Sequence, residues 1–236
     1  MFNKYFILLS LILTSSVFGS MSILHHRYGT KAVAMGGAFT AMEETADTLF
    51  YNWSKINNIE KSNLSIQHTL YLDTPVYTFV WRAPFNQKNF GVGALYSEVT
   101  DLQQTSLNEL NQPLLENKIF NQRMGSIFVT ARKKILNTHV GIKFGLFEEK
   151  IKSTTGKASY TDIALQHSFH LLKTPINFGI TVKNIFSNKI KWNPGQSQFE
   201  PYYINTGIAT MLKKNKLQLA LDIETNSANK KNKFFF

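Results

Sequence analysis

The residues of this chain best suited to chemistry are its six histidines and a glycine pair, Gly36-Gly37. None of the histidines forms a His-Glu-x-x-His pattern. The neighbouring pair His25-His26 is explained more simply as part of the mature N-terminus than as a metal-binding pair, so we expect no metal site. The chain has no Gly-x-Ser-x-Gly sequence and no cysteine nucleophile. Gly36-Gly37 lacks the rest of a phosphate-binding loop, and its lysine, Lys31, lies upstream. We therefore expect a protein that is not an enzyme and has no cofactor.

The segment that carries the glycine pair reads as a bend followed by a helix. Gly36 and Gly37 permit a tight backbone bend. The apolar residues after it are spaced by three, four and three positions, which indicates one helical stripe, formed by Phe39, Met42, Ala46 and Leu49. Three acidic residues lie off the stripe: Glu43, Glu44 and Asp47. A helix of about a dozen residues is too short to be stable alone, so it must pack on something.

The start of the chain predicts export. Residues 1–19 have a short basic start, an apolar run at Tyr5 to Leu13 and a cut expected before Ser20, which is typical of a signal peptide. The apolar run is too short to span a bilayer. No cysteine follows that could form a disulfide or carry a lipid.

The formal net charge of +11 does not indicate nucleic-acid binding. The lysines are scattered or gather at predicted turns, as in Arg132-Lys133-Lys134, whereas a nucleic-acid binder needs a continuous basic face. Two interpretations of these turns remain open, namely ordinary solvated turns and contact with anionic lipid headgroups.

From Ser62 onward the hydrophobic period changes to two, as in Leu217 to Glu224, where apolar and polar residues alternate. Nine segments show this pattern, near 63–72, 75–83, 89–99, 123–134, 138–150, 159–171, 175–186, 202–213 and 216–225. Each is long enough for a tilted membrane strand. Aromatic residues lie near several segment ends, as an interfacial girdle requires. A soluble β-sandwich would also alternate, so the period alone does not choose between the two folds.

The lengths of the predicted connections favour a barrel. When the joins are assigned alternately to two sides, the long ones (100–122, 151–158 and 187–201) fall on the same side, and the other side receives short turns. This asymmetry is expected of an outer-membrane barrel with long loops outside and short turns in the periplasm. We therefore expect an all-β, antiparallel, up-and-down transmembrane β-barrel with a short N-terminal helical plug.

The stretch from Gly29 to Ile56 resembles the N-terminal motif of PorV/PorQ-type outer-membrane barrels, which are distantly akin to FadL fatty-acid transporters. The matching residues are Gly29, Ala32, Met35, Gly36, Gly37, Ala38, Phe39, Ala41, Tyr51 and Asn52. Trp53, Ser54 and Lys55 stand where the family has Pro-Ala-Gly. Further similar stretches lie along the strands: Gly179 to Asn184, Trp192 with Gly195, Pro201 and Gly207, and Leu217 to Asp222.

The resemblance implies a bacterial outer-membrane protein organised as a signal peptide (1–19), a plug segment (20–61) and a barrel (62–236). Nine strands leave an unpaired edge, so we also expect the given chain to be incomplete at its C-terminus. The resemblance implies two roles: passage of small hydrophobic molecules or, as the alternative, a surface scaffold or accessory for secreted proteins. An outer-membrane enzyme ranks third, because no nucleophile–base pair is visible. The expected plug or gate residues are Gly36, Gly37, Phe39, Met42, Leu49 and Asn52.

Overall fold

The computed structural model describes residues 23–42, 45–55, 62–71, 74–85, 88–107, 112–172, 174–193, 195–212, 217–227 and 232–235. The predicted signal peptide, Glu43 and Glu44 lie outside the described residues. The described chain is all-β with a few short helices, which confirms the predicted fold class at that level.

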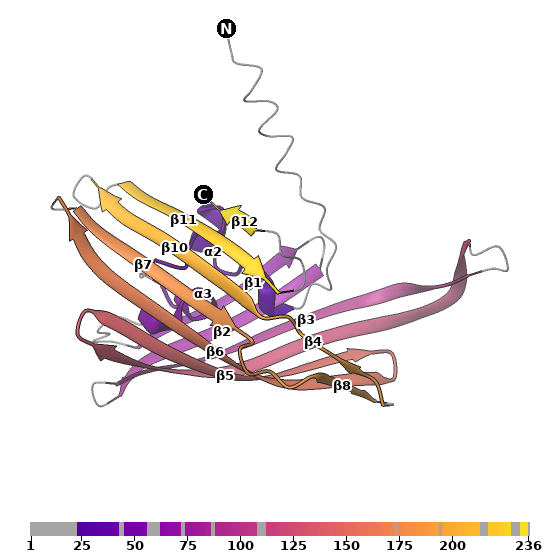
Figure 1. Cartoon of the computed structure of the whole chain (residues 1–236). Helices are drawn as coiled ribbons and strands as arrows, with labels where there is room; N and C mark the ends of the chain where they lie inside the picture. The colour runs from indigo at the N-terminus through magenta and orange to yellow at the C-terminus, as the bar shows by residue number, and fades with distance from the viewer. Residues whose placement is uncertain are drawn as a thin grey trace, which may run out of the picture.

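One antiparallel sheet contains all the strands (Figure 1). They are β1 (Asn63–Tyr71), β2 (Thr74–Phe85), β3 (Lys88–Leu107), β4 (Pro113–Ile135), β5 (Thr138–Ile151), β6 (Thr154–Leu171), β7 (Thr174–Lys183), β8 (Ile190–Asn193), β9 (Ser197–Gln198), β10 (Tyr203–Leu212), β11 (Leu217–Asn226) and β12 (Asn232–Phe235). The order is up-and-down from β1 to β7 and then β10 to β12, while β8 pairs with β6 and β9. The nine predicted segments correspond to β1 to β7, β10 and β11.

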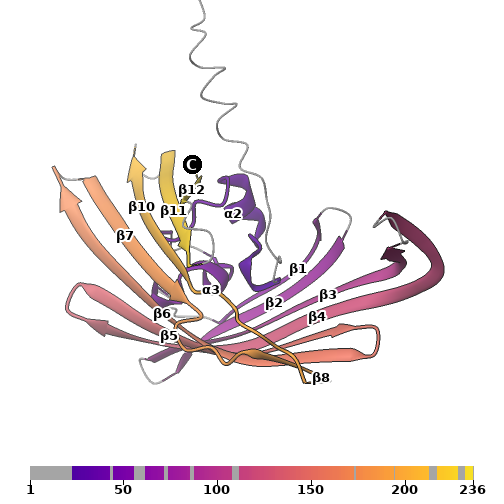
Figure 2. The ribbon, with the colours of Figure 1, turned by 45° about the vertical axis from the view of Figure 1, so that its right-hand side comes forward.

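The sheet is curved but not closed (Figure 2). Within the described residues, β1 pairs with β2 alone and β12 pairs with β11 alone, so these two strands form the edges. The β-barrel expected from the sequence, which the nine predicted strands were expected to leave incomplete, is therefore not confirmed, and the described strands form an open sheet. Closure would require the first strand to pair with the last, and β1 and β12 are not paired in the described residues.

All three of the predicted long loops contain strand, and the one at 187–201 holds the short strands β8 and β9. The expected loop at 100–122 is mostly a hairpin in which β3 and β4 reach beyond the other strands at one end (Figure 1). The pairing register shifts between Val99 and Leu102 and again between Gln103 and Thr105. Such bulges interrupt the two-residue period, so the alternation that identifies a strand is lost there. Similarly, β6 begins at Thr154, inside the expected loop at 151–158.

The described N-terminal residues lie inside the curve of the sheet (Figure 2). They form four short helices: η1 (Ile23–His25), α2 (Thr30–Ala34), α3 (Thr48–Tyr51) and η2 (Trp53–Lys55). None of the described helices is long and apolar enough to cross a bilayer. We call residues 23–55, as far as they are described, the N-terminal segment.

The predicted helix through Phe39 and Leu49 is not formed as one unit. Of its described residues, those from Thr48 onward are α-helical, whereas Ala38 to Met42 are irregular. Within this irregular stretch the main-chain N–H groups of Phe39 and Thr40 donate to Asp222 of the sheet, whereas those of Ala38 and Met42 donate to carbonyls three residues earlier in the segment. The apolar spacing therefore reports burial on the sheet and not a helical backbone.

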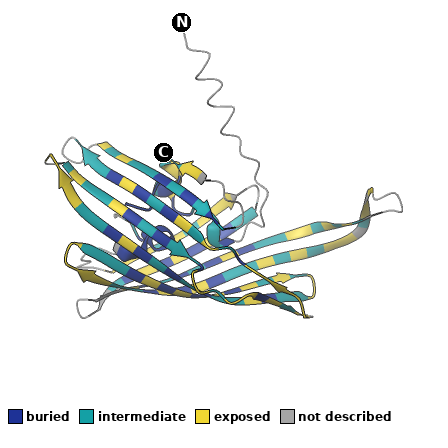
Figure 3. Ribbon diagram, in the orientation of Figure 1, coloured by how far each residue is buried: buried dark blue, intermediate teal, exposed yellow. Residues whose placement is uncertain are grey.

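The two faces of the sheet differ in polarity, and burial alternates along the strands (Figure 3). The concave face, which the N-terminal segment covers, carries buried polar and charged side chains among small and apolar ones. These polar residues include Thr78, Arg82, Ser126, Thr130, Lys143, Asp162, Gln166, Thr181, Asn205 and Asp222. The convex face carries exposed apolar side chains, including Phe79, Trp81, Ile127, Val129, Ile142, Phe144, Leu146, Phe178 and Ile208.

Candidate functional site

The candidate site is the contact between the N-terminal segment and four neighbouring strands. Gln166 of β6, Gly179 of β7, Gly207 of β10 and Asp222 of β11 are direct cross-strand partners of one another. Because direct partners point to the same face of a sheet, the four form one row across the concave face. We call these four residues the docking row.

The two ends of the docking row hold the main chain of residues 39 to 41. The Asp222 carboxylate oxygen Oδ2 accepts hydrogen bonds from the main-chain N–H groups of Phe39 (2.9 Å) and Thr40 (2.8 Å). At the other end, Gln166 Nε2 donates a hydrogen bond of 2.8 Å to the carbonyl oxygen of Ala41. A carboxylate that accepts from two main-chain donors is a strong, oriented interaction.

The two glycines between these ends let the backbone approach the sheet. A Cβ atom at Gly179 would collide with the carbonyl oxygen of Thr40. A Cβ atom at Gly207 would lie 3.0 Å from Thr40 Cβ and would collide with the carboxylate of Asp222. Any larger residue at either position would therefore displace Thr40, which is 1% exposed.

Asn52 ties the two halves of the N-terminal segment to each other and to the sheet. Its Nδ2 donates to the carbonyl oxygens of Thr40 (2.8 Å) and Leu165 (3.1 Å). Its Oδ1 accepts from the N–H (3.1 Å) and the hydroxyl (2.5 Å) of Ser54. All of the bonding capacity of this buried amide is used within the site.

The predicted apolar stripe is buried against the concave face. Phe39, Met42 and Leu49 are each at most 2% exposed. The ring of Phe39 lies 5.1 Å from that of Tyr51. Leu49 fills the space that a Cβ atom at Gly91 of β3 would occupy. The same logic applies at Gly141 of β5, where a Cβ atom would lie 2.8 Å from the backbone of Ser54.

Gly36 and Gly37 form a bend, as predicted, and this bend ends helix α2. The N–H of Gly37 donates to the carbonyl of Ala32 (2.8 Å), and the N–H of Gly36 donates to that of Val33 (3.0 Å). With φ of 61° and 87°, this is a Schellman-type helix end in which the first glycine takes the left-handed conformation. The pair turns the chain toward the docking row.

Charged side chains surround the glycine pair and the start of the segment. Arg27 donates to the carbonyl of Gly37 and to the carboxylate of Glu224 on β11, at 3.2 Å in both cases. Its guanidinium lies 3.9 Å from the ring centroid of Phe235 on β12. Arg27 thus links the N-terminal segment to the last two described strands.

His25 lies at the opposite end of the segment from Asn52, and its ring centroid lies 3.7 Å from that of Tyr203, with the two rings tilted by 30°. Burial lowers the pKa of His25 well below 6.5, and the nearby positive charge of Lys183 lowers it further. Its Nε2 lies 3.9 Å from the carboxylate of Glu200, too far for a hydrogen bond. Burial also raises the pKa of Glu200 above its ordinary value.

The interface leaves little free space next to these groups. A cavity of about 20 Å³ lies beside His25, Tyr28, Phe50, Lys143 and Asp162. Such a volume holds about one water molecule. In the described interface, the N-terminal segment therefore fills the concave face closely at this point.

The structure gathers four of the predicted site residues, Phe39, Met42, Leu49 and Asn52, in this interface, and places Gly36 and Gly37 at its margin. Sequence reasoning did not assign a site role to Gln166 or Asp222. The sequence signal that could have pointed to this row was the set of stretches that resemble the barrel family, because Gly179, Gly207 and Asp222 all fall in them. No family model matches this chain, and no curated protein or solved structure is significantly similar to it.

Proposed function

We propose that this chain is a bacterial outer-membrane β-barrel protein in which the curved sheet belongs to a membrane-spanning barrel wall and the N-terminal segment is a fixed plug. The observation that carries the proposal is the inverted polarity of the sheet. Its exposed convex face is apolar, and its covered concave face is rich in polar side chains. This is the arrangement that a barrel wall in lipid requires.

A water-soluble sheet would be expected to bury its apolar face. Here Ile127, Val129 and Ile142 are 60%, 53% and 52% exposed, and they lie on neighbouring strands. Contiguous apolar surface of this kind is rare on soluble monomers and is typical of membrane or partner contact. Lipid is therefore the proposed neighbour of the convex face.

Of the two roles implied by the resemblance, the interface favours the non-transporting scaffold, with exported proteins as the proposed partners. Residues 39 to 41 are held by Asp222 and Gln166 over two glycines that they cover. Passage of a hydrophobic molecule past this point would require all of these contacts to open. A plug built this way suits a barrel whose outer surface and hairpins do the binding.

The membrane part of the proposal is tested by expressing the full-length gene in a Gram-negative host and fractionating the envelopes. We expect the protein in the outer-membrane fraction, resistant to extraction with alkaline carbonate, and migrating faster in unheated than in heated gel samples. Recovery of the folded protein in the soluble periplasmic fraction would overturn the proposal.

The role is tested by uptake of a labelled long-chain fatty acid into cells with the gene, without it, and with Gly36→Val and Gly37→Val. For a fixed plug we expect equal uptake in all three, because no path opens in any of them. By contrast, Phe39→Asp places a charge in the buried interface and should increase permeability to small dyes. Uptake that depends on the gene and is lost in the glycine variant would favour the transport role instead.

A further inference from the structure

The convex face changes from apolar to basic along its strands, toward the end where β3 and β4 project. One cross-strand row across β2 to β5 is apolar and consists of Phe79, Ala94, Ile127 and Leu146. The next row toward the projecting end is aromatic and then charged: Tyr77, Tyr96, Gly125, Glu148 and Lys157. Beyond it follow Glu98, Arg123 and Lys150.

Two open grooves adjoin this boundary. The first, of about 510 Å³, has a floor that includes Ile127 and Leu146 and is bordered by the lysines Lys157, Lys189 and Lys191. The second, of about 590 Å³, lies further toward the projecting end and is lined by basic residues, which are Lys118, Arg123, Lys150 and Lys152. The grooves meet along β4 and β5, where Gly125 and Arg123, and Glu148 and Lys150, are successive residues of the same face.

The positive charge at these grooves is only partly neutralised by neighbouring carboxylates. Three of the seven basic residues have acidic partners: Arg123 with Glu98 (2.8 Å), Lys157 with Glu148 (2.8 Å) and Lys118 with Glu116 (3.7 Å). In the described part of the chain, the other four lysines have no carboxylate within ion-pair distance; they are Lys150, Lys152, Lys189 and Lys191. Lys152 donates instead to the side-chain oxygen of Gln104.

We propose that this basic boundary, defined as Lys150, Lys152, Lys189 and Lys191, binds the phosphate groups of an anionic lipid in the outer leaflet. The inference rests on the proposed membrane location, because that location puts lipid against the convex face. The ammonium groups supply point charges and donors for phosphate oxygens, and the apolar floor of the first groove takes the start of an acyl chain. A free phosphate ion would use the lysines but not the floor.

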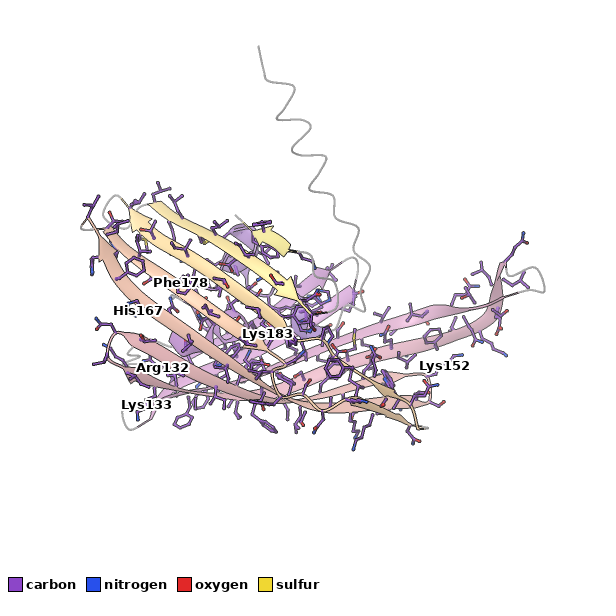
Figure 4. All side chains as sticks on the ribbon, viewed as in Figure 1. Arg132, Lys133, Lys152, His167, Phe178 and Lys183 are labelled. Atoms are coloured by element: carbon purple, nitrogen blue, oxygen red, sulfur yellow. The ribbon has the colours of Figure 1, made fainter. Side chains whose placement is uncertain are left out.

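Two lysines at the other end of the strands supply a control for the basic boundary. Figure 4 shows Lys152 at one end of the strands and Arg132 and Lys133 at the other end. Lys133 and Lys134 are also exposed lysines on a strand that reaches the basic boundary, but they lie next to the short β4–β5 turn. The basic boundary has four lysines and the turn has two, and in the proposed orientation the two groups face opposite leaflets.

The test uses the purified full-length protein in a neutral detergent and measures binding of a bisphosphorylated lipid A by native mass spectrometry. The variant carries Lys150→Gln, Lys152→Gln, Lys189→Gln and Lys191→Gln, and the control carries Lys133→Gln and Lys134→Gln. We expect the variant to bind at least about tenfold more weakly and the control to bind within about twofold of the original protein. Removing the phosphates from the lipid should weaken binding to the original protein by a similar factor.

Equal binding by the original protein and the four-lysine variant would overturn the inference, as would equal binding of the dephosphorylated lipid. Complete displacement of the lipid by millimolar inorganic phosphate would overturn the assignment to a lipid. Each variant is checked for the same resistance to protease and the same outer-membrane fractionation as the original protein. Failure of the original protein to enter the outer membrane would refute the proposed function, whereas failure of lipid binding by a correctly inserted protein would refute the inference alone.

Discussion

At the scale of single residues, Asp222 does the most to fix the N-terminal segment. Its buried carboxylate accepts hydrogen bonds from two main-chain N–H groups. These two groups lie in an irregular stretch, so they have no partner in a helix or a strand ladder. Buried donors without partners are costly, so the irregular chain at Phe39 and Thr40 depends on this side chain. Asn52 also fixes this irregular stretch, because its side-chain amide donates a hydrogen bond to the carbonyl oxygen of Thr40.

We expect Asp222→Asn to lower the free energy of unfolding by about 1–3 kcal/mol, since one oxygen, Oδ2, accepts both main-chain bonds and a neutral amide oxygen is a weaker acceptor than a carboxylate oxygen. The measurement is the temperature at which the protein loses its fast-migrating form in gels. Glu148→Gln, on the exposed convex face, is the control and should leave that temperature unchanged. An unchanged temperature in Asp222→Asn would contradict the role given to this carboxylate.

His25 predicts a dependence on pH. Its pKa is lowered in the folded state, so the unfolded state binds the proton more readily between the folded pKa and 6.5, and stability falls as the pH falls through that window. Glu200, whose pKa is raised, acts in the opposite direction. We expect the loss of thermal stability between pH 7 and pH 5 to be smaller in His25→Phe, which keeps a ring against Tyr203. An identical loss in both proteins would show that His25 does not contribute.

At the scale of elements, glycines on the strands decide how closely the N-terminal segment approaches the sheet. Gly91, Gly141, Gly179 and Gly207 lie on four different strands, and each faces an atom of the segment that a Cβ would displace. The N-terminal segment therefore packs against the strand backbone at these glycines as well as against side chains elsewhere on the sheet.

We expect Gly179→Ala to destabilise the protein by about 1–3 kcal/mol, because Thr40 would have to move away from the sheet. Gly125→Ala is the matched control, since a Cβ there would meet its nearest atom, the carbonyl oxygen of Leu95, at an ordinary 3.6 Å. Thermal unfolding and limited proteolysis within the N-terminal segment report the effect. Equal stability of the two variants would mean that the segment is not pressed against β7.

The strands could be predicted from the sequence more completely than the N-terminal segment could. The two-residue period located β1, β7, β10 and β11 closely, because one face of each is apolar and the other is not. The same period failed at the bulges between Val99 and Thr105, so the long hairpin was predicted as a loop. The helical spacing of Phe39 and Leu49 identified burial correctly but not backbone form. That form is set by Asp222 and Gln166, which are distant in sequence.

At the scale of the whole molecule, the N-terminal segment bridges the two ends of an open sheet. Asp47 accepts hydrogen bonds from Gln67 (2.7 Å) and Ser65 (3.2 Å) of β1, while Arg27 bonds to Glu224 of β11. The segment thus connects the first strand to the last strands across the concave face. Curvature of the sheet and burial of the segment depend on each other.

We expect Asp47→Ala to loosen β1 more than any interior strand, since β1 has a single strand neighbour and loses both bonds to the segment. Hydrogen exchange of the main-chain amides in β1 should become at least about tenfold faster, and exchange in β5 should stay the same. Uniform acceleration across all strands would instead indicate global destabilisation.

The bonds between Thr40 and Asp222 join residues 182 positions apart in the chain, and this separation bears on how the protein assembles. Thr40 is synthesised long before the strands that hold it. It must remain unfolded until β6, β7, β10 and β11 have paired, because those strands together form its binding surface. Such long-range closure is slow, since the loop entropy is lost before the contacts form. Folding should therefore end with the burial of the N-terminal segment, and a kinetic intermediate should contain a paired sheet whose first residues are still open to protease.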